Sequence, residues 1–135
     1  MLSKETEMSD PAPATASIEA LRAEVLEPIA PKLASLVPDI GKLTQSFAYG
    51  QVWSREGLSL RDRSIATIGA LIALNVPDEL QLHVLRGLDN GLTKEEIGEI
   101  ILQLAPYIGF PLTVTAAKSV ADVVARADVG EGKAS

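Results

Sequence analysis

The sequence predicts one all-α domain of about six helices. Apolar residues recur three and four positions apart along most of the chain, the spacing that places them on one face of a helix. Helix start and stop signals fall between these stretches, and no segment alternates apolar and polar residues as a half-buried strand does. With 135 residues, 47% of them hydrophobic and 22% charged, the chain can bury one moderate core, and we expect no second folded domain.

The two ends of the chain differ in composition from its middle. Residues 1–16 are small, polar and proline-containing, and residues 128–135 (DVGEGKAS) have the same character. Such segments bury too little apolar surface to offset the entropy lost on folding. We therefore expect a disordered leader at 1–16, a helical domain at 17–127 and a flexible tail at 128–135.

The first helices are interrupted by prolines. Ser17 is suited to begin a helix, and Pro28 and Pro31 break or kink its second half. Residues 39–53 predict a second helix. Near one face of that helix lie Ile40, Leu43, Phe47 and, less regularly, Val52. Residues 54–58 are expected to form a loop.

A strongly apolar helix follows this loop. Ser59, with Asp62 three residues later, is a helix start signal. The apolar residues that follow lie on all sides of the helix, which predicts a central position in the fold. We expect this helix to end at Asn75 and another to span residues 78–90, closed at Asn90-Gly91 by a residue that can adopt positive φ.

Two further helices complete the predicted fold. Thr93-Lys94-Glu95-Glu96 reads as a capping box that begins one of them, and Pro106 breaks or kinks its end. Residues 109–111 (Gly-Phe-Pro) predict a turn, and residues 112–127 predict the last helix.

Composition excludes several classes of function. The chain has no cysteine, so disulfides, thiolate metal sites and thiol catalysis are excluded. A formal net charge of −6 argues against a nucleic-acid partner, which requires a basic face. Charged residues interrupt every apolar run before it reaches the length of a membrane span, and residues 1–16 lack the apolar core of a signal peptide. We therefore expect a cytoplasmic protein without a membrane partner.

Few residues are candidates for chemistry. His83, the single histidine, shares a helix face with Arg86, and an imidazole exchanges protons near neutral pH, although a lone histidine is more often structural. Trp53 and Arg55 flank a glycine-bearing loop and Tyr107 lies beside Pro106, where an aromatic side chain can line a pocket or simply pack. No metal-ligand spacing, Walker motif, dinucleotide fingerprint or nucleophile elbow is present.

Over roughly residues 45–125 the sequence resembles the carboxymuconolactone decarboxylase family. Three segments carry the resemblance: residues 50–58 (GQVWSREGL), residues 82–97 with Leu82-His83 and NGLTKEEI, and residues 102–111 (LQLAPYIGFP). The resemblance implies an all-helical, AhpD-like fold that is usually assembled as a homo-oligomer, a trimer or a hexamer. It also implies a small anionic organic substrate and no cofactor.

The chain departs from the family pattern at several positions. In the peroxidase branch a CxxCxxxH motif leads to the histidine, and anchoring it on His83 places its cysteines at Val76 and Glu79. In the decarboxylase branch a glutamate usually stands where this chain has Gln51, and a cysteine is often found where it has Ile108. Glutamine cannot exchange a proton at neutral pH, but its amide can donate a hydrogen bond.

The resemblance implies removal of carbon dioxide from a carboxylated unsaturated lactone, followed by protonation of the resulting dienolate. The site needs a proton source and an anion contact in desolvated surroundings. The implied catalytic residues are His83 as proton donor, Arg55 as anion contact and Gln51 as amide donor, and Arg86 is the alternative anion contact. The implied substrate-binding residues are Trp53, Arg86 and Tyr107.

Two other functions stay open on the sequence. One is a divergent oxidoreductase of the AhpD-like superfamily, in which thiol chemistry is replaced. The other is a non-catalytic oligomeric protein that binds a small molecule and has lost the carboxylate at position 51.

Overall fold

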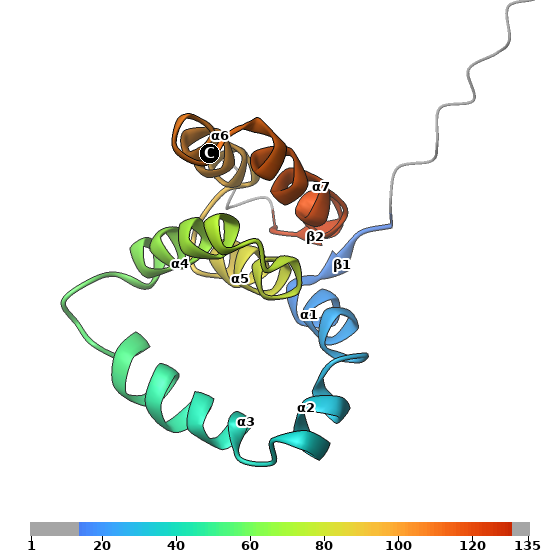
Figure 1. The fold of residues 1–135 in the computed structure, drawn as a ribbon, viewed down its shortest axis with the longest axis vertical. Coiled ribbons are helices and arrows are strands. Elements are labelled where there is room, and N and C mark those ends of the chain that lie inside the picture. The colour runs from blue at the N-terminus through green and yellow to red at the C-terminus, as the bar shows by residue number, and fades with distance from the viewer. Residues whose placement is uncertain (1–13, 131–135) are drawn as a thin grey trace, which may run out of the picture.

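The computed structural model describes residues 14–130, and helices dominate this part of the chain (Figure 1). In chain order the elements are β1 (Ala16–Ser17), α1 (Ile18–Leu26), α2 (Ala30–Leu36), α3 (Ile40–Leu43), the π-helical segment η1 (Thr44–Trp53), α4 (Leu60–Leu74), α5 (Pro77–Asp89), α6 (Lys94–Ile108), α7 (Phe110–Arg126) and β2 (Ala127–Asp128). The predicted all-α class is confirmed.

Helix α5 is the centre of the core. It packs against α1, α4 and α7, and its buried apolar residues follow the three- and four-residue spacing of one helix face: Leu80, Val84, Leu85 and Leu88. Gly87 lets α4 approach closely, because a Cβ at this position would lie 3.1 Å from Ile68 Cδ1 and 2.9 Å from Leu92 Cδ1. The predicted central helix, α4, is instead exposed along one side, with Leu60 and Leu74 in solvent.

Local signals explain where the helices begin and end. The side chains of Ser17, Ser59 and Thr93 accept hydrogen bonds from backbone N–H groups in the first turns of α1, α4 and α6, and Thr93 forms the predicted capping box with Glu96. Asn75 ends α4 with a φ of 56°. These predicted boundaries are confirmed.

The predicted turn at residues 109–111 is shorter in the structure. Helix α6 continues through Pro106 to Ile108, and α7 begins at Phe110, so Gly109 alone joins the two helices. Proline is tolerated at position 111 because the first turn of a helix has no partner for its N–H group. Gly109 adopts φ 88° and ψ 156°, a conformation that is almost restricted to glycine.

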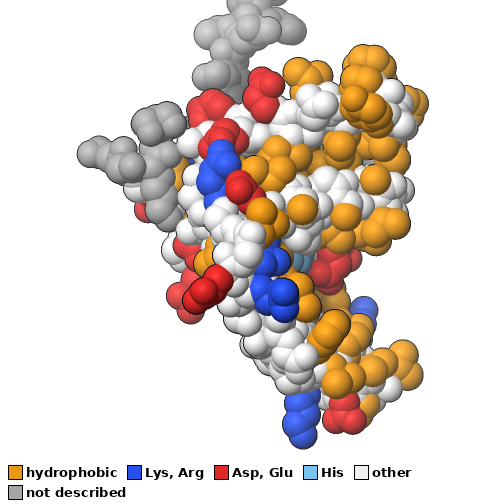
Figure 2. Space-filling model, turned by 90° about the vertical axis from the view of Figure 1, so that its left-hand side faces the viewer, with side chains coloured by type: hydrophobic (Ala, Val, Ile, Leu, Met, Phe, Trp, Pro, Cys, Tyr) orange, Lys and Arg blue, Asp and Glu red, His pale blue; other side chains and the backbone are white. Residues whose placement is uncertain are grey.

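Helix α2, α3 and η1 form an arm, residues 30–53, that curves away from the core (Figure 1). No side chain from residue 30 to residue 47 is buried or half-buried. The predicted helix at 39–53 is present, but most of it has the wider π-helical hydrogen bonding. Large apolar side chains of the arm and of other elements therefore reach the surface, and Figure 2 shows such side chains gathered over one face.

A short parallel pair joins the two ends of the described chain. Ala16 in β1 pairs with Ala127 in β2, and Ser17 pairs with Asp128, which extends the ordered structure by one residue beyond each predicted domain boundary. Most of the predicted leader and tail, residues 1–13 and 131–135, lies outside the described residues. None of the helices in residues 14–130 combines the length and the apolar character needed to cross a membrane.

Candidate active site

A cavity of about 370 Å³ lies between α1, the arm and α5. Its polar lining includes both basic and acidic groups from three elements: Arg22, Thr44, Gln45, Tyr49, Glu79, His83 and Arg86. Apolar side chains cover the rest of the wall: Leu26, Leu33, Ile40 and Leu82. The volume suits a small organic molecule of a few carbon atoms.

Helix α5 places its polar residues in this cavity through its periodicity. Glu79, His83 and Arg86 are four and three residues apart and so lie on one face, opposite the face that packs in the core. The same helix thus contributes buried leucines to the core and titratable groups to the cavity.

An aromatic stack connects the arm to α5. The rings of Tyr49 and Trp53 are stacked at 5.9 Å between centroids, and the Trp53 and His83 rings are stacked at 5.9 Å with an interplanar angle of 19°. The guanidinium carbon of Arg86 lies 4.3 Å from the Tyr49 ring centroid and 6.0 Å from that of Trp53. These are the geometries of aromatic stacking and of cation–π contact, and they fix the orientation of both His83 and Arg86.

The environment of His83 favours the neutral imidazole. Desolvation lowers its pKa to about 4, and the positive charges of Arg86 and Arg22 act in the same direction. Its Nδ1 atom is buried and has no hydrogen-bond partner within residues 14–130. His83 therefore has an unused polar atom and a proton affinity that depends on the charges around it.

The cavity contains more positive than negative charge. Two guanidinium groups, of Arg22 and Arg86, line it together with the one carboxylate of Glu79. None of the ion pairs formed within the described part of the chain includes either arginine. A half-buried positive charge without a counterion favours an anionic ligand.

The structure brings together three of the six residues singled out from the sequence. His83, Trp53 and Arg86 form one contact network, whereas Gln51 and Arg55 are exposed and do not line the cavity. Gln51 lies two residues from both Tyr49 and Trp53, so it points to another side of η1.

Arg55 and Tyr107 lie outside the cavity lining. The Arg55 carbonyl accepts a hydrogen bond from the Arg63 guanidinium at 3.0 Å, which fixes the loop after η1. Tyr107, in the last turn of α6, is 77% exposed and does not line the cavity. The catalytic and binding roles assigned to all six residues stay predictions.

Three charged or aromatic residues of the cavity were not found from the sequence. Glu79 could have been found, because it shares the helix face of His83 and Arg86. Tyr49 belongs to the segment that carries the family resemblance, four residues before Trp53. Arg22 comes from α1, and no sequence signal connects it with a histidine sixty residues away.

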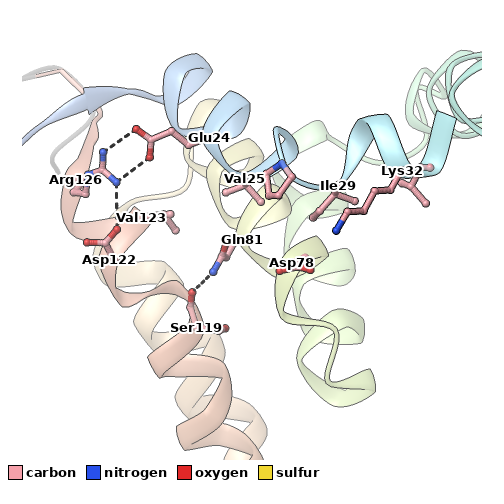
Figure 3. Close-up of a pocket in the computed structure, with 12 residues that line it drawn as sticks. Glu24, Val25, Ile29, Lys32, Asp78, Gln81, Ser119, Asp122, Val123 and Arg126 are labelled. Carbon is pink, nitrogen blue, oxygen red and sulfur yellow. Dashed lines mark hydrogen bonds and ion pairs between the residues drawn. The ribbon is translucent and has the colours of Figure 1, made fainter. Parts of the chain in front are cut away.

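A larger pocket of about 550 Å³ lies between α1, α5 and α7 (Figure 3). Its arginine, Arg126, is already paired with Glu24 at 3.0 Å and with Asp122 at 3.3 Å. The side-chain amide of Gln81 donates to the Ser119 carbonyl. Because these groups satisfy one another and the lining contains no histidine or aromatic ring, we place the candidate site in the cavity at His83.

Within residues 14–130, no group of three histidine, aspartate or glutamate side chains is placed to hold a metal ion.

Comparison with known sequences identifies a family. The sequence profile of the carboxymuconolactone decarboxylase family matches residues 38–122, which include the arm from α3 onward and most of α4 to α7. His83, Trp53 and Arg86 lie within this match, and Arg22 lies outside it.

Three relatives show how far the similarity extends. The chain is 44% identical to 4-carboxymuconolactone decarboxylase of Acinetobacter baylyi over 73 residues, 54% of each chain. It is 38% identical to nitrosuccinic acid decarboxylase npaB of Metarhizium robertsii over 96 residues, 68% of this chain and 65% of that one. It is 35% identical over 96 residues to an uncharacterized 15.0 kDa protein of Paracoccus denitrificans, 69% of this chain and 71% of that one. The chain thus spans between about half and two thirds of the length of the two decarboxylases.

Proposed function

The chain belongs to the carboxymuconolactone decarboxylase family, and from this premise we propose that it is a cofactor-independent decarboxylase or lactone-processing enzyme for a small anionic lactone or ring compound. One observation carries the proposal: a desolvated histidine, held by an aromatic stack, faces a cavity with two unpaired guanidinium groups. The names of two relatives, a carboxymuconolactone decarboxylase and a nitrosuccinic acid decarboxylase, support the reaction class.

The proposed reaction needs no external electron acceptor. The bond between a ring carbon and the carboxylate breaks, carbon dioxide leaves, and the electron pair moves into the conjugated lactone to give a dienolate. Protonated His83 then delivers its proton to the carbon alpha to the carbonyl, and it regains a proton from water. The apolar wall of the cavity desolvates the leaving carboxylate, and Arg86 stabilises the negative charge of the dienolate.

Substrate binding supplies the protonated histidine in this scheme. Without ligand, His83 is neutral near pH 7, since its pKa is lowered to about 4. A carboxylate bound next to Arg22 and Arg86 offsets the charges of both arginines and raises the pKa of His83. The proton donor is thus formed only when an anion occupies the cavity.

We also propose that the protein is a homo-oligomer, a trimer or a hexamer. Apolar residues spaced four, three and four positions apart lie exposed along the arm: Leu36, Ile40, Leu43 and Phe47. These residues belong to three successive segments, α2, α3 and η1, and exposed apolar side chains gathered in this way are typical of an interface. The cytoplasm is the proposed location, because the chain lacks the cysteines common in small exported domains.

The decisive test is turnover of γ-carboxymuconolactone by the purified protein, followed as loss of substrate absorbance and release of carbon dioxide. We expect His83→Ala to lower kcat by at least about 100-fold, because general acid catalysis typically contributes this much. Lys118→Gln is the matched control: Lys118 is exposed on α7, away from the cavity, and we expect its replacement to leave kcat unchanged.

Two outcomes would argue against the proposal. Undiminished turnover in His83→Ala would remove His83 from the mechanism. No carbon dioxide from either protein, combined with ligand-dependent quenching of Trp53 fluorescence, would favour the non-catalytic binding function.

A further inference from the structure

We propose that Arg22 binds the carboxylate that the substrate keeps, and so makes the cavity specific for a dicarboxylate. The inference rests on the proposed function and extends it to a residue outside the family match, which begins at residue 38. Arg22 thus acts as a substrate-binding residue that α1 contributes to a site whose other polar groups come from α5 and the arm.

The surroundings of Arg22 support this role. Its side chain is half-buried in the cavity wall, and its Nε atom is buried without a hydrogen-bond partner among the described residues. An unsatisfied buried N–H group costs free energy that an acceptor on a ligand recovers. A guanidinium presents parallel N–H donors that match the two oxygens of a carboxylate.

Arg22 and Arg86 differ in what already holds them. The Arg86 guanidinium lies over the Tyr49 ring and near the Trp53–His83 stack, at the place where proton transfer is proposed. Within residues 14–130, Arg22 forms neither a cation–π contact with the aromatic stack nor an ion pair.

The two arginines therefore suit two different anionic groups. A carboxylate that must leave as neutral carbon dioxide gains nothing in the transition state from a strong ion pair, because that contact stabilises the ground state more. A carboxylate that stays can be held tightly throughout the reaction. Arg22, which comes from α1, is the group left free for the retained carboxylate.

The test compares two substrates and four proteins. The substrates are γ-carboxymuconolactone and its analogue in which the retained carboxylate is a primary amide. The proteins are wild type, Arg22→Gln, Arg22→Lys and Lys118→Gln, the last of which removes one positive charge outside the cavity. Far-UV circular dichroism and Tm check that each variant folds.

We expect Arg22→Gln to lower kcat/KM for the dicarboxylate by about 10- to 100-fold, the loss of one charged hydrogen-bonding pair. With the amide analogue, the same variant should stay within about threefold of wild type, since the amide offers no charge for Arg22 to bind. For Arg22→Lys, kcat/KM for the dicarboxylate should lie between the values of wild type and Arg22→Gln, because lysine keeps the charge and lacks the paired donors.

Binding is measured separately from turnover by quenching of Trp53, the one tryptophan of the chain, in a His83→Ala background. The role of Arg22 would be overturned if Arg22→Gln lost kcat/KM equally on both substrates or lost none on the dicarboxylate. It would also be overturned if the His83→Ala protein with Arg22 intact did not bind the dicarboxylate. Arg22-dependent binding without carbon dioxide release would instead overturn the decarboxylase proposal and support the role of Arg22.

Discussion

At His83, burial and two guanidinium groups act in the same direction on one proton. Desolvation is the largest cause of the lowered pKa, and the charges of Arg86 and Arg22 add to it. Trp53 covers one face of the ring, so the imidazole keeps its orientation whichever charge it carries. A carboxylate bound beside His83 would favour the protonated imidazole, which is the property that the proposed reaction requires.

Stability should depend on pH through His83. The folded-state pKa of about 4 lies below the unfolded value of 6.5, so the unfolded chain binds a proton that the folded chain does not. The free energy of unfolding should therefore fall as the pH decreases from about 6.5 to about 4, by at most about 3 kcal/mol, and this group should contribute no further loss below pH 4.

Urea unfolding at a series of pH values measures this slope. The His83→Gln variant provides the control, because it should lack the part of the slope between pH 6.5 and 4 while retaining the contributions of the carboxylates. Identical slopes in both proteins would mean that His83 is not held neutral in the fold.

At the scale of single elements, glycines and caps decide where helices stop and how they bend. In η1 a Cβ on Gly50 would lie 3.1 Å from the Gln45 carbonyl oxygen, so the wide π-helical turn leaves little room at that position. Gly50 lies in η1 between Tyr49 and Trp53, the two residues whose rings are stacked. π-Helical turns are often found at functional sites, and here one presents two aromatic rings to α5.

Two glycines, one inside α6 and one at its C-terminal end, should respond oppositely to alanine. Gly109→Ala should lower the free energy of unfolding by about 1 to 3 kcal/mol, because φ 88° with ψ 156° is strained for any residue with a Cβ. Gly98→Ala should raise it by about 1 kcal/mol, because Gly98 lies inside α6, where an added Cβ meets nothing within 4 Å and alanine favours the helix.

Both changes are measured by chemical denaturation, and each serves as the control for the other because the covalent change is the same. A stabilising Gly109→Ala would show that the α6–α7 junction does not require the glycine conformation.

At the scale of the whole molecule, the charge of the surface and that of the cavity have opposite signs. The chain carries a net charge of −6, yet the cavity lining has two arginines and one glutamate. The acidic surface disfavours nucleic acids and non-specific anions, while the local positive charge favours an anion small enough to enter. The arm that forms one wall of the cavity is also the most exposed part of the fold, so assembly and the site are connected through it.

A charge placed among the exposed apolar side chains of the arm should change the assembly state. Leu36 is 84% exposed and Phe47 60% exposed, so a carboxylate at Phe47 costs little in the isolated chain but a great deal in an apolar interface. We expect Phe47→Asp to convert a trimer or hexamer into a smaller species.

Multi-angle light scattering after size-exclusion chromatography gives the mass of each species. Ala121→Asp is the control, because Ala121 is exposed on α7, outside the arm, and its replacement should leave the mass unchanged. A monomeric wild-type protein would contradict the proposed assembly.

The sequence by itself determined the helical class, the helix boundaries that carry a local cap or stop, and the family. Caps at Ser17, Ser59 and Thr93 and the stop at Asn75 are local, because the hydrogen bonds involved join residues within one turn. The resemblance was read from contiguous motifs, and the profile match at residues 38–122 confirms it.

Only the tertiary structure decided which helix is central and which residues share the cavity. Periodicity shows which face of a helix is apolar but not what covers it, so α4 was predicted to be central where α5 is. Arg22 and His83 line the same cavity only because α1 packs against α5. Gln51 does not line it, because its position in the π-helical η1 places it on another side of that segment from Tyr49. A site assembled from separate helices depends on their packing, and packing is a property of the whole chain rather than of any segment.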